Sequence, residues 1–423
     1  DCLLSRGLGD VYKRQGTIFS VFIGFLFKIF LARELGADML GLFALGMSIV
    51  SLLSIFLSLG LGNGLVKYVS KYVAKKNYIQ LHTYIRKTIE ITLLMSVIAA
   101  FILIYYKDFI SSNLVKTASL NGYMSYFAVL LIFNALISIF DHIIRGLQEV
   151  KKSVLIGHFI RLPLKIMVCY LLIHLGFNLE GYLLAEIVAS ILALFLLFKL
   201  ILEILPNEMR SIFKNSKTAI SKEERKFGNN MLILNIVGPL SSHADKITLA
   251  YFFTENEIGV NAICLTIIAF IPTVLISVNS IFAPIISELH TKNNNRLLKY
   301  YYQNSSKYIF ILTYPLIIFL AFFSENVMNI FGQDFLIGSN LLLLLLVGEL
   351  FNISSGSVGI ILNMCGFDTI TRNVNVLCSI IVVFFYILLI PLYGLIGVGI
   401  GRLMYVAVSY THLRAHETRG NLV

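Results

Sequence analysis

Long apolar runs separated by short polar connections fill the chain from residue 16 to residue 408. Each run can cross a hydrocarbon core of about 30 Å as a helix, which takes roughly 20 residues. The runs are continuous rather than alternating in polarity, which is typical of helices and not of barrel strands. We expect twelve spans, at residues 16–33, 40–66, 88–106, 121–141, 153–175, 180–203, 226–251, 257–283, 307–325, 337–363, 374–392 and 394–408, the last of them short. The pattern predicts an all-α integral membrane protein.

Composition and charge agree with this class. Of the 423 residues, 57% are hydrophobic and 13% are charged, whereas soluble domains carry about 25% charged residues. The formal net charge is +11, but the basic residues gather in the loops after even-numbered spans, and the alternate loops hold only Arg33, Lys107 and Lys116. The positive-inside rule then predicts a multi-pass protein of the cytoplasmic membrane with its amino end in the cytoplasm. The charge therefore sets topology, and we expect no nucleic-acid partner.

A membrane hairpin occurs twice in the sequence. Residues 31–66 match residues 249–284 without a gap, and Lys28 and Lys246 take the same place before each copy. The identical positions are Leu31/Leu249, Ala32/Ala250, Gly41/Gly259, Ala44/Ala262, Ile49/Ile267 and Leu57/Leu275. Parallel repeats of this kind build two-lobed transporters.

The repeat predicts two six-helix lobes around a central cavity. We assign residues 16–203 to the amino-terminal lobe and residues 226–408 to the carboxyl-terminal lobe, with a cytoplasmic linker at 204–225. In each lobe the second span is followed by a segment with spaced Lys, Arg, Tyr and Leu, at 67–87 and 284–306. We expect these segments to lie on the membrane surface as amphipathic stretches.

Both ends of the chain break the apolar pattern abruptly. Residues 1–15 lack the apolar core of a signal peptide, which is roughly 7 to 15 residues long. We interpret residues 1–15 and 409–423 as non-native tails. On this interpretation the carboxyl end is truncated within the last helix.

Four basic residues are candidates for lining the cavity, because a cation inside a span is costly and usually faces a bundle interior or water. Arg161 and Lys165 are four residues apart in the fifth span and share one helix face. Lys28 and Lys246 are candidates because they are duplicated. Snorkelling of Lys28 and Lys246 to the outer surface is the alternative for that pair.

Three acidic residues lie within the spans as well. Glu186 and Glu349 are buried candidates for coupling to an ion or for structural ion pairs, and the sequence leaves both readings open. Asp245 adjoins Lys246, but successive helical residues point about 100° apart, so we expect Asp245 to find a partner on another helix. No metal-ligand spacing, catalytic constellation or phosphate-binding loop occurs, and we expect no metal, no cofactor and no enzymatic activity.

Several stretches resemble one transporter family. They are LARELGADMLGLF and LGLGNGLVKYV within residues 16–77, DKITLAYFFTENEIGV at 245–260, NIFGQDF at 329–335 and LIPLYGLIGVGIG at 389–401. Over residues 16–408 the chain resembles polysaccharide-repeat flippases of the O-antigen and teichoic acid type. These belong to the multidrug/oligosaccharidyl-lipid/polysaccharide exporter superfamily, whose fold is two six-helix bundles around a central cavity.

The resemblance implies a flippase that moves undecaprenyl-diphosphate-linked oligosaccharide repeat units across the cytoplasmic membrane by alternating access, for cell-surface polysaccharide synthesis. Its partners would be the lipid-linked oligosaccharide, membrane lipids, a polysaccharide polymerase and glycosyltransferases. Arg161, Lys165, Lys28 and Lys246 would engage phosphate or sugar. The alternatives are a multidrug/cation antiporter of the same superfamily, a flippase of lipid-linked peptidoglycan precursors, and a membrane glycan polymerase or ligase.

Overall fold

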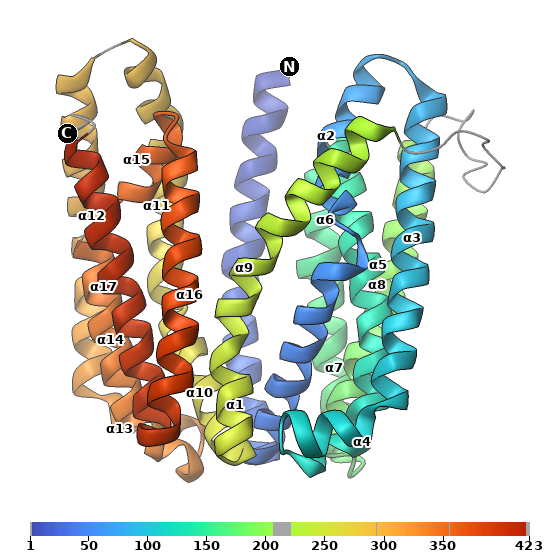
Figure 1. Cartoon of the computed structure of the whole chain (residues 1–423), viewed down its shortest axis with the longest axis vertical. Coiled ribbons are helices and arrows are strands. Elements are labelled where there is room, and N and C mark those ends of the chain that lie inside the picture. Colours follow the sequence, from blue (N-terminus) through green and yellow to red (C-terminus); the bar gives the residue numbers. More distant parts are fainter. Residues whose placement is uncertain (1, 206–220, 293, 355, 420–423) are drawn as a thin grey trace. The chain divides into compact units, whose positions relative to one another are not determined.

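The computed structural model describes residues 2–205, 221–292, 294–354 and 356–419, and nearly all of them are helical (Figure 1). The described residues contain no strand. The helices are α1 (Cys2–Leu57), α2 (Leu61–Ala74), α3 (Tyr78–Tyr105), α4 (Lys107–Phe109), α5 (Met124–Gly146), α6 (Val150–Val154), α7 (Leu162–His174), α8 (Leu179–Ile204), α9 (Lys222–Phe252), α10 (Glu255–Ile268), α11 (Phe270–Thr291), α12 (Asn295–Phe322), α13 (Ser324–Phe331), α14 (Ser339–Ser354), α15 (Val358–Met364), α16 (Asp368–Tyr393) and α17 (Leu395–Arg419). Tighter or wider turns lie at Ile110–Leu114, Ala118–Tyr123, Leu155–Arg161 and Gln333–Gly338.

The predicted all-α membrane architecture is confirmed. Within the described chain, nine helical stretches are long and apolar enough to cross a membrane. The first of them, Phe19–Leu57, holds two predicted spans, because Gly36 (φ 74°, ψ 178°) interrupts the helix at the first predicted outer turn. Glycine reaches this conformation without a Cβ clash. With α9 and the shorter apolar helix Leu395–Thr411, the spans account for the predicted twelve.

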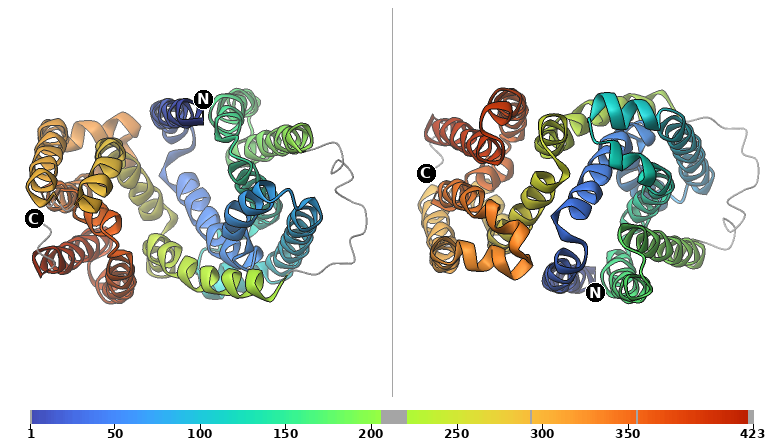
Figure 2. Two further views of the ribbon diagram at one scale, coloured as in Figure 1. Left: turned by 90° about the horizontal axis from the view of Figure 1, so that it is seen from above. Right: turned by 90° about the horizontal axis from the view of Figure 1, so that it is seen from below.

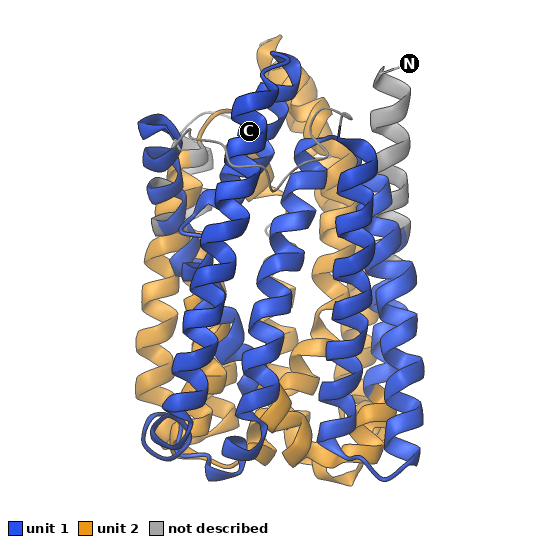
Figure 3. Cartoon of the chain, turned by 90° about the vertical axis from the view of Figure 1, so that its right-hand side faces the viewer, with its two compact units in different colours: residues 1–28, 45–239 blue, residues 29–44, 240–423 orange. Residues whose placement is uncertain are grey.

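The chain forms two compact units, coloured separately in Figure 3. Unit 1 comprises residues 1–28 and 45–239, and unit 2 comprises residues 29–44 and 240–423. In unit 1, α5 packs against α2, α3 and α8, and α7 packs against α8. In unit 2, α17 packs against α14 and α16, and α12 packs against α11 and α14. Figure 2 shows these helices nearly end-on.

This grouping differs from the predicted lobes in two respects, and the first is that residues 226–239 belong with unit 1. The second is that residues 29–44 belong with unit 2, where Gly41 and Gly259 bring two helix backbones together. A Cβ on Gly41 would lie 1.8 Å from the carbonyl oxygen of Glu255, and a Cβ on Gly259 would lie 2.0 Å from that of Ala37. The repeated glycines therefore meet each other in a reciprocal contact. Small residues permit such close helix approach in membranes.

The prediction that residues 67–87 lie on the membrane surface is wrong. After a turn in which Leu59 (φ 47°) and Gly60 (φ 73°) have left-handed backbones, the chain continues as α2. Leu65, Tyr68 and Tyr72 on this helix are buried in the core of unit 1. The apolar face of α2 finds its partners in α3 and α5, so it is not left for the membrane surface. The second segment, 284–306, likewise divides between α11 and α12.

The beginning of α9 is fixed to α2 by a carboxylate. Glu224 Oε2 accepts from the backbone N–H of Ser221 at 2.6 Å, and Ser221 Oγ accepts from the N–H of Glu224 at 3.2 Å, which is a capping box. Glu224 Oε1 also accepts from the Tyr72 hydroxyl at 2.5 Å. Burial first, and then the Glu224 carboxylate, raises the pKa of Tyr72, so the phenol stays protonated and donates.

Most of the predicted linker, residues 206–220, lies outside the described residues. The two end helices extend into the predicted tails, since α1 begins at Cys2 and α17 ends at Arg419. Tyr410, in the second of these tails, donates a hydrogen bond from its hydroxyl to Asn352 on α14. The six-plus-six lobes and the non-native origin of the tails remain predictions.

Candidate functional site

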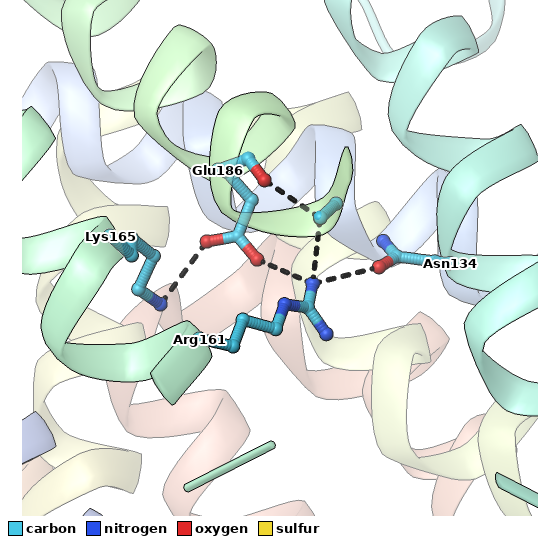
Figure 4. A network of polar contacts seen from close by, with 5 residues as sticks. Asn134, Arg161, Lys165 and Glu186 are labelled. Carbon is cyan, nitrogen blue, oxygen red and sulfur yellow. Dashed lines mark hydrogen bonds and ion pairs between the residues drawn. The ribbon is translucent and has the colours of Figure 1, made fainter. Parts of the chain in front are cut away.

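Two of the predicted cations share one carboxylate within unit 1 (Figure 4). Arg161 Nη2 lies 2.9 Å from Glu186 Oε1, and Lys165 Nζ lies 3.1 Å from Glu186 Oε2. The three side chains carry two positive charges and one negative charge. We call Arg161, Lys165 and Glu186 the ionic triad.

A local change in helix winding brings Arg161 to this position. The turn before it, Leu155–Arg161, is π-helical, and α7 begins directly afterwards with Pro163 in its first turn. Pro163 has no N–H to donate to the carbonyl of Phe159, so the regular α-helical ladder is interrupted here. Wider turns of this kind often lie at functional sites. The four-residue spacing to Lys165 then places both cations toward α8, as the sequence predicted.

Two further residues complete the network, and sequence reasoning missed both. Arg161 Nη2 also donates to Asn134 Oδ1 at 3.1 Å and to Ser190 Oγ at 3.0 Å. Ser190 Oγ in turn donates to the carbonyl oxygen of Glu186 at 2.7 Å. Ser190 follows Glu186 by one helical turn, and Asn134 interrupts an otherwise apolar run. The spacing of Ser190 from Glu186 and the isolated polar residue Asn134 could both have been recognised in the sequence.

Because the ionic triad is largely buried, the Glu186 carboxylate needs both of its cationic partners. Glu186 is 7% exposed, and the side chains of Arg161 and Lys165 are 22% and 19% exposed. A carboxylate at this depth is tolerated because two cations offset its lost hydration, whereas removing one partner leaves an uncompensated buried charge. Glu186 therefore forms structural ion pairs, which is one of the two roles that the sequence left open. Any coupling role remains a prediction.

Lys165 and Arg161 have different surroundings. The Nζ atom of Lys165 lies 5.8 Å from the ring centroid of Phe27 and 6.0 Å from that of Tyr182, within cation–π range. Both rings are buried. Arg161 instead lines a cavity of about 330 Å³ between α5, α6 and α8. The lining residues are Asn134, Ile137, Ser138, Asp141, Arg145, Val150, Ser153, Val154, Ile156, Gly157, His158, Arg161, Ala193 and Leu197.

The duplicated lysines fall in different units. Lys28 is half-buried on α1 in unit 1, and its neighbour Phe27 packs against Tyr182 at a ring-centroid distance of 5.9 Å. Lys246 lies on α9 in unit 2, where its Nζ is 3.4 Å from Asp245 Oδ1. The expected cross-helix partner of Asp245 is also present, since Asn261 Nδ2 on α10 donates to Asp245 Oδ2 at 2.8 Å.

Glu349 is held by an amide rather than by a cation. It is buried on α14 and accepts from Asn352 Nδ2 at 2.8 Å. No ion pair within 4 Å involves Glu349 in the described part of the chain. Of the seven predicted site residues, the structure joins Arg161, Lys165 and Glu186 in one contact group and Asp245 and Lys246 in another. The first group lies in unit 1, where its members make direct contacts with one another.

The sequence matches a known family over most of its length. The family described as "Polysaccharide biosynthesis protein" matches residues 30–337. An uncharacterized membrane protein of Methanocaldococcus jannaschii is 26% identical over 408 residues, covering 89% of this chain and 77% of that protein. A Haloferax volcanii protein named "Probable low-salt glycan biosynthesis flippase Agl15" is 22% identical over 406 residues, covering 95% of this chain and 80% of that protein.

Solved structures show the same fold at lower identity. An inward-facing transporter of the multidrug resistance MATE family, in the MOP superfamily, superposes with a TM-score of 0.76 at 15% identity and covers 95% of both chains. The lipid II flippase MurJ, in an inward closed conformation, gives a TM-score of 0.75 at 15% identity, covering 97% of this chain and 89% of that one. The chain therefore belongs to the polysaccharide biosynthesis protein family and has the two-lobed fold of the MOP superfamily of transporters.

Proposed function

We propose that this membrane protein is a flippase that moves an undecaprenyl-diphosphate-linked oligosaccharide from the inner to the outer leaflet of the cytoplasmic membrane. The family match and the printed name of the Haloferax relative support a glycan-lipid cargo. The observation that carries the proposal is the ionic triad, in which Arg161 and Lys165 face a single carboxylate, Glu186. The site keeps an excess positive charge inside the span region.

An excess cation suits this cargo on electrostatic grounds. A diphosphate loses its hydration as it passes through a medium of low dielectric constant, and this loss is offset only by fixed positive charge and hydrogen bonds. The polyprenyl tail can stay in lipid, while the glycan needs a polar path. The proposed cycle is alternating access. No covalent bond forms or breaks in this step, so the proposal includes no catalytic residue and no cofactor.

Topology and partners follow from the same proposal. The basic loops favour an amino end in the cytoplasm, where a lipid-linked glycan would be assembled by glycosyltransferases. Its product would be delivered to a polysaccharide polymerase on the other side. Lys28 and Lys246 are included as further cavity cations, and Glu349 and Asp245 as candidates for coupling.

A multidrug or cation antiporter is the second candidate, because the MATE family shares the fold. An antiporter for organic cations would favour an unpaired acidic group in the amino-terminal lobe. In unit 1, however, the deep carboxylate Glu186 is already paired with two cations. A membrane glycan polymerase or ligase is disfavoured because the longest predicted outer loop, 107–120, offers only Lys107, Asp108 and Lys116 as charged groups.

Reconstitution separates these candidates. The purified chain is placed in proteoliposomes that contain either a fluorescent undecaprenyl-diphosphate-linked oligosaccharide or a fluorescent organic cation under a proton gradient. The proposal predicts movement of the glycan lipid and no gradient-driven uptake of the cation. Cation uptake without glycan-lipid movement would assign the chain to the antiporters.

A further inference from the structure

The cavity beside the ionic triad has a distinct chemistry of its own. We infer that it binds a phosphate-class anion against the open edge of Arg161, and that Lys165 lies outside this anion site. The inference deepens the proposed function, and it rests on that function only for the source of the anion. It separates two residues that the sequence alone treats as equivalent.

The guanidinium of Arg161 is hydrogen-bonded through one of its three nitrogens, Nη2. Nη2 makes contacts with Asn134, Glu186 and Ser190 at 2.9 to 3.1 Å. Nε and Nη1 form no hydrogen bond with the residues that the structure describes, and Figure 4 shows Nη1 turned away from Glu186. Because Arg161 lines the cavity, its open donors are available to a ligand there. A planar fork of donors fixed in advance is suited to bidentate binding of phosphate.

The rest of the cavity lining supplies further polar groups. Arg145 Nη2 pairs with Asp141 Oδ2 at 2.6 Å, and the Ser153 hydroxyl donates to the same carboxylate. The imidazole of His158 is hydrogen-bonded to Ser20 Oγ at 2.5 Å through Nδ1. All four lining residues are at or near the inner end of the fourth and fifth predicted spans. The cavity therefore runs from the triad toward the hairpin that joins those spans.

Charge and size both favour an anion. Among the charged side chains of the lining, there are two guanidinium groups, of Arg145 and Arg161, and one carboxylate, of Asp141. The carboxylate of Glu186 does not line the cavity, so it neutralises Arg161 from behind rather than across the opening. A volume of about 330 Å³ has room for on the order of ten water molecules. It can accommodate a hydrated diphosphate.

Lys165 is separated from this opening. It is absent from the cavity lining, and its ammonium group is shared between Glu186 and the rings of Phe27 and Tyr182. A phosphate in the cavity would meet Arg161 first. Lys165 is therefore a positioning residue for Glu186, which in turn holds the guanidinium.

Binding of two probes to the purified full-length chain tests the inference. Inorganic pyrophosphate and farnesyl diphosphate are titrated calorimetrically in detergent, and farnesol serves as the uncharged control. Arg161→Gln should weaken anion binding by about 10- to 100-fold, because it removes charge-assisted hydrogen bonds. Lys165→Gln should weaken it less than Arg161→Gln does, and the matched control Lys199→Gln, at an exposed ion pair outside the cavity lining, should change it by less than about threefold.

A cavity-filling variant tests the location without touching a charge. A Cβ at Gly157 would meet no atom within 4 Å, although Gly157 lines the cavity. Gly157→Leu should therefore fill the opening without displacing the backbone and weaken binding by at least about tenfold. Gly122→Leu is the matched control, since Gly122 also faces open space but does not line the cavity.

The outcomes are distinct. Binding of both probes with this variant pattern supports recognition of the anion itself, and binding of farnesyl diphosphate alone with the same pattern assigns the anion to a lipid. The inference is overturned if neither probe binds, if Gly157→Leu binds as tightly as the unaltered chain, or if Lys165→Gln loses as much affinity as Arg161→Gln. Intact anion binding with no glycan-lipid movement would refute the proposed function and leave the anion site standing.

Discussion

A methyl group at Gly41 should separate two helices that touch through their backbones. In Gly41→Ala the new Cβ would lie 1.8 Å from the carbonyl oxygen of Glu255 and 3.0 Å from the nitrogen of Gly259. Such contacts are essentially never shorter than 3.0 Å, so the helices must move apart by at least about 1.2 Å. Neither obstacle is a side chain that can rotate away. We expect the free energy of unfolding to fall by about 1 to 3 kcal/mol, which is the usual cost of overpacking.

The reciprocal geometry sharpens this prediction. Gly259→Ala should cost a similar amount, because its Cβ would lie 2.0 Å from the carbonyl oxygen of Ala37. Both substitutions require the same helix separation, so the double variant should cost little more than the worse single variant. The stability of all three variants is measured by heating the protein in detergent and recording how much monodisperse protein remains at each temperature. Gly359→Ala is the control, because its Cβ meets nothing within 4 Å. Equal stability of Gly41→Ala and Gly359→Ala, or strictly additive losses, would refute the reasoning.

Two other perturbations follow from the polar contacts of unit 1. Glu186→Gln leaves Arg161 and Lys165 without a counter-charge and should destabilise the chain by about 3 kcal/mol. This value is near the lower end of the usual cost of breaking a buried ion pair, because both cations are about one-fifth exposed. Glu203→Gln removes an exposed ion pair and should change stability by less than about 1 kcal/mol in the same thermal assay; equal losses would contradict the buried assignment. Tyr72→Phe removes a buried hydrogen bond to the first turn of α9 and should cost about 1 to 3 kcal/mol at neutral pH. Because the folded state raises the pKa of Tyr72, this stabilisation is complete below about pH 10 and declines above it, so denaturant titrations of the variant and the unaltered chain should converge in alkaline solution; a difference that grows with pH would contradict the assignment.

Much of the fold was accessible from the sequence because the membrane imposes a simple rule. Continuous apolar length predicts a spanning helix regardless of its neighbours. The repeated glycines, Gly41 and Gly259, were found from sequence identity alone, and their close approach gives that identity a physical meaning. The cross-helix partner of Asp245 also followed from helix geometry, although its identity as Asn261 did not.

The remaining features depend on tertiary packing. Periodicity shows that α2 has an apolar face, but not whether lipid or protein covers it, and here Tyr68 and Tyr72 are buried in protein. Spacing places Arg161 and Lys165 on one face, but their different surroundings come from the π-helical turn and from Phe27 on a distant helix. Asn134 is a single amide in an apolar run, and only the folded chain shows that it holds Arg161.

Translocation of the glycan lipid is the most direct test of the account. Proteoliposomes carrying a fluorescent undecaprenyl-diphosphate-linked oligosaccharide are treated with a membrane-impermeant quencher, and the rate at which protected lipid becomes accessible is measured. The account predicts rapid exchange with the unaltered chain and with Gly122→Leu, and a rate reduced by about tenfold or more with Arg161→Gln. A rate for the unaltered chain equal to that of protein-free liposomes would contradict the proposed function. An undiminished rate for Arg161→Gln would remove this arginine from the transport path.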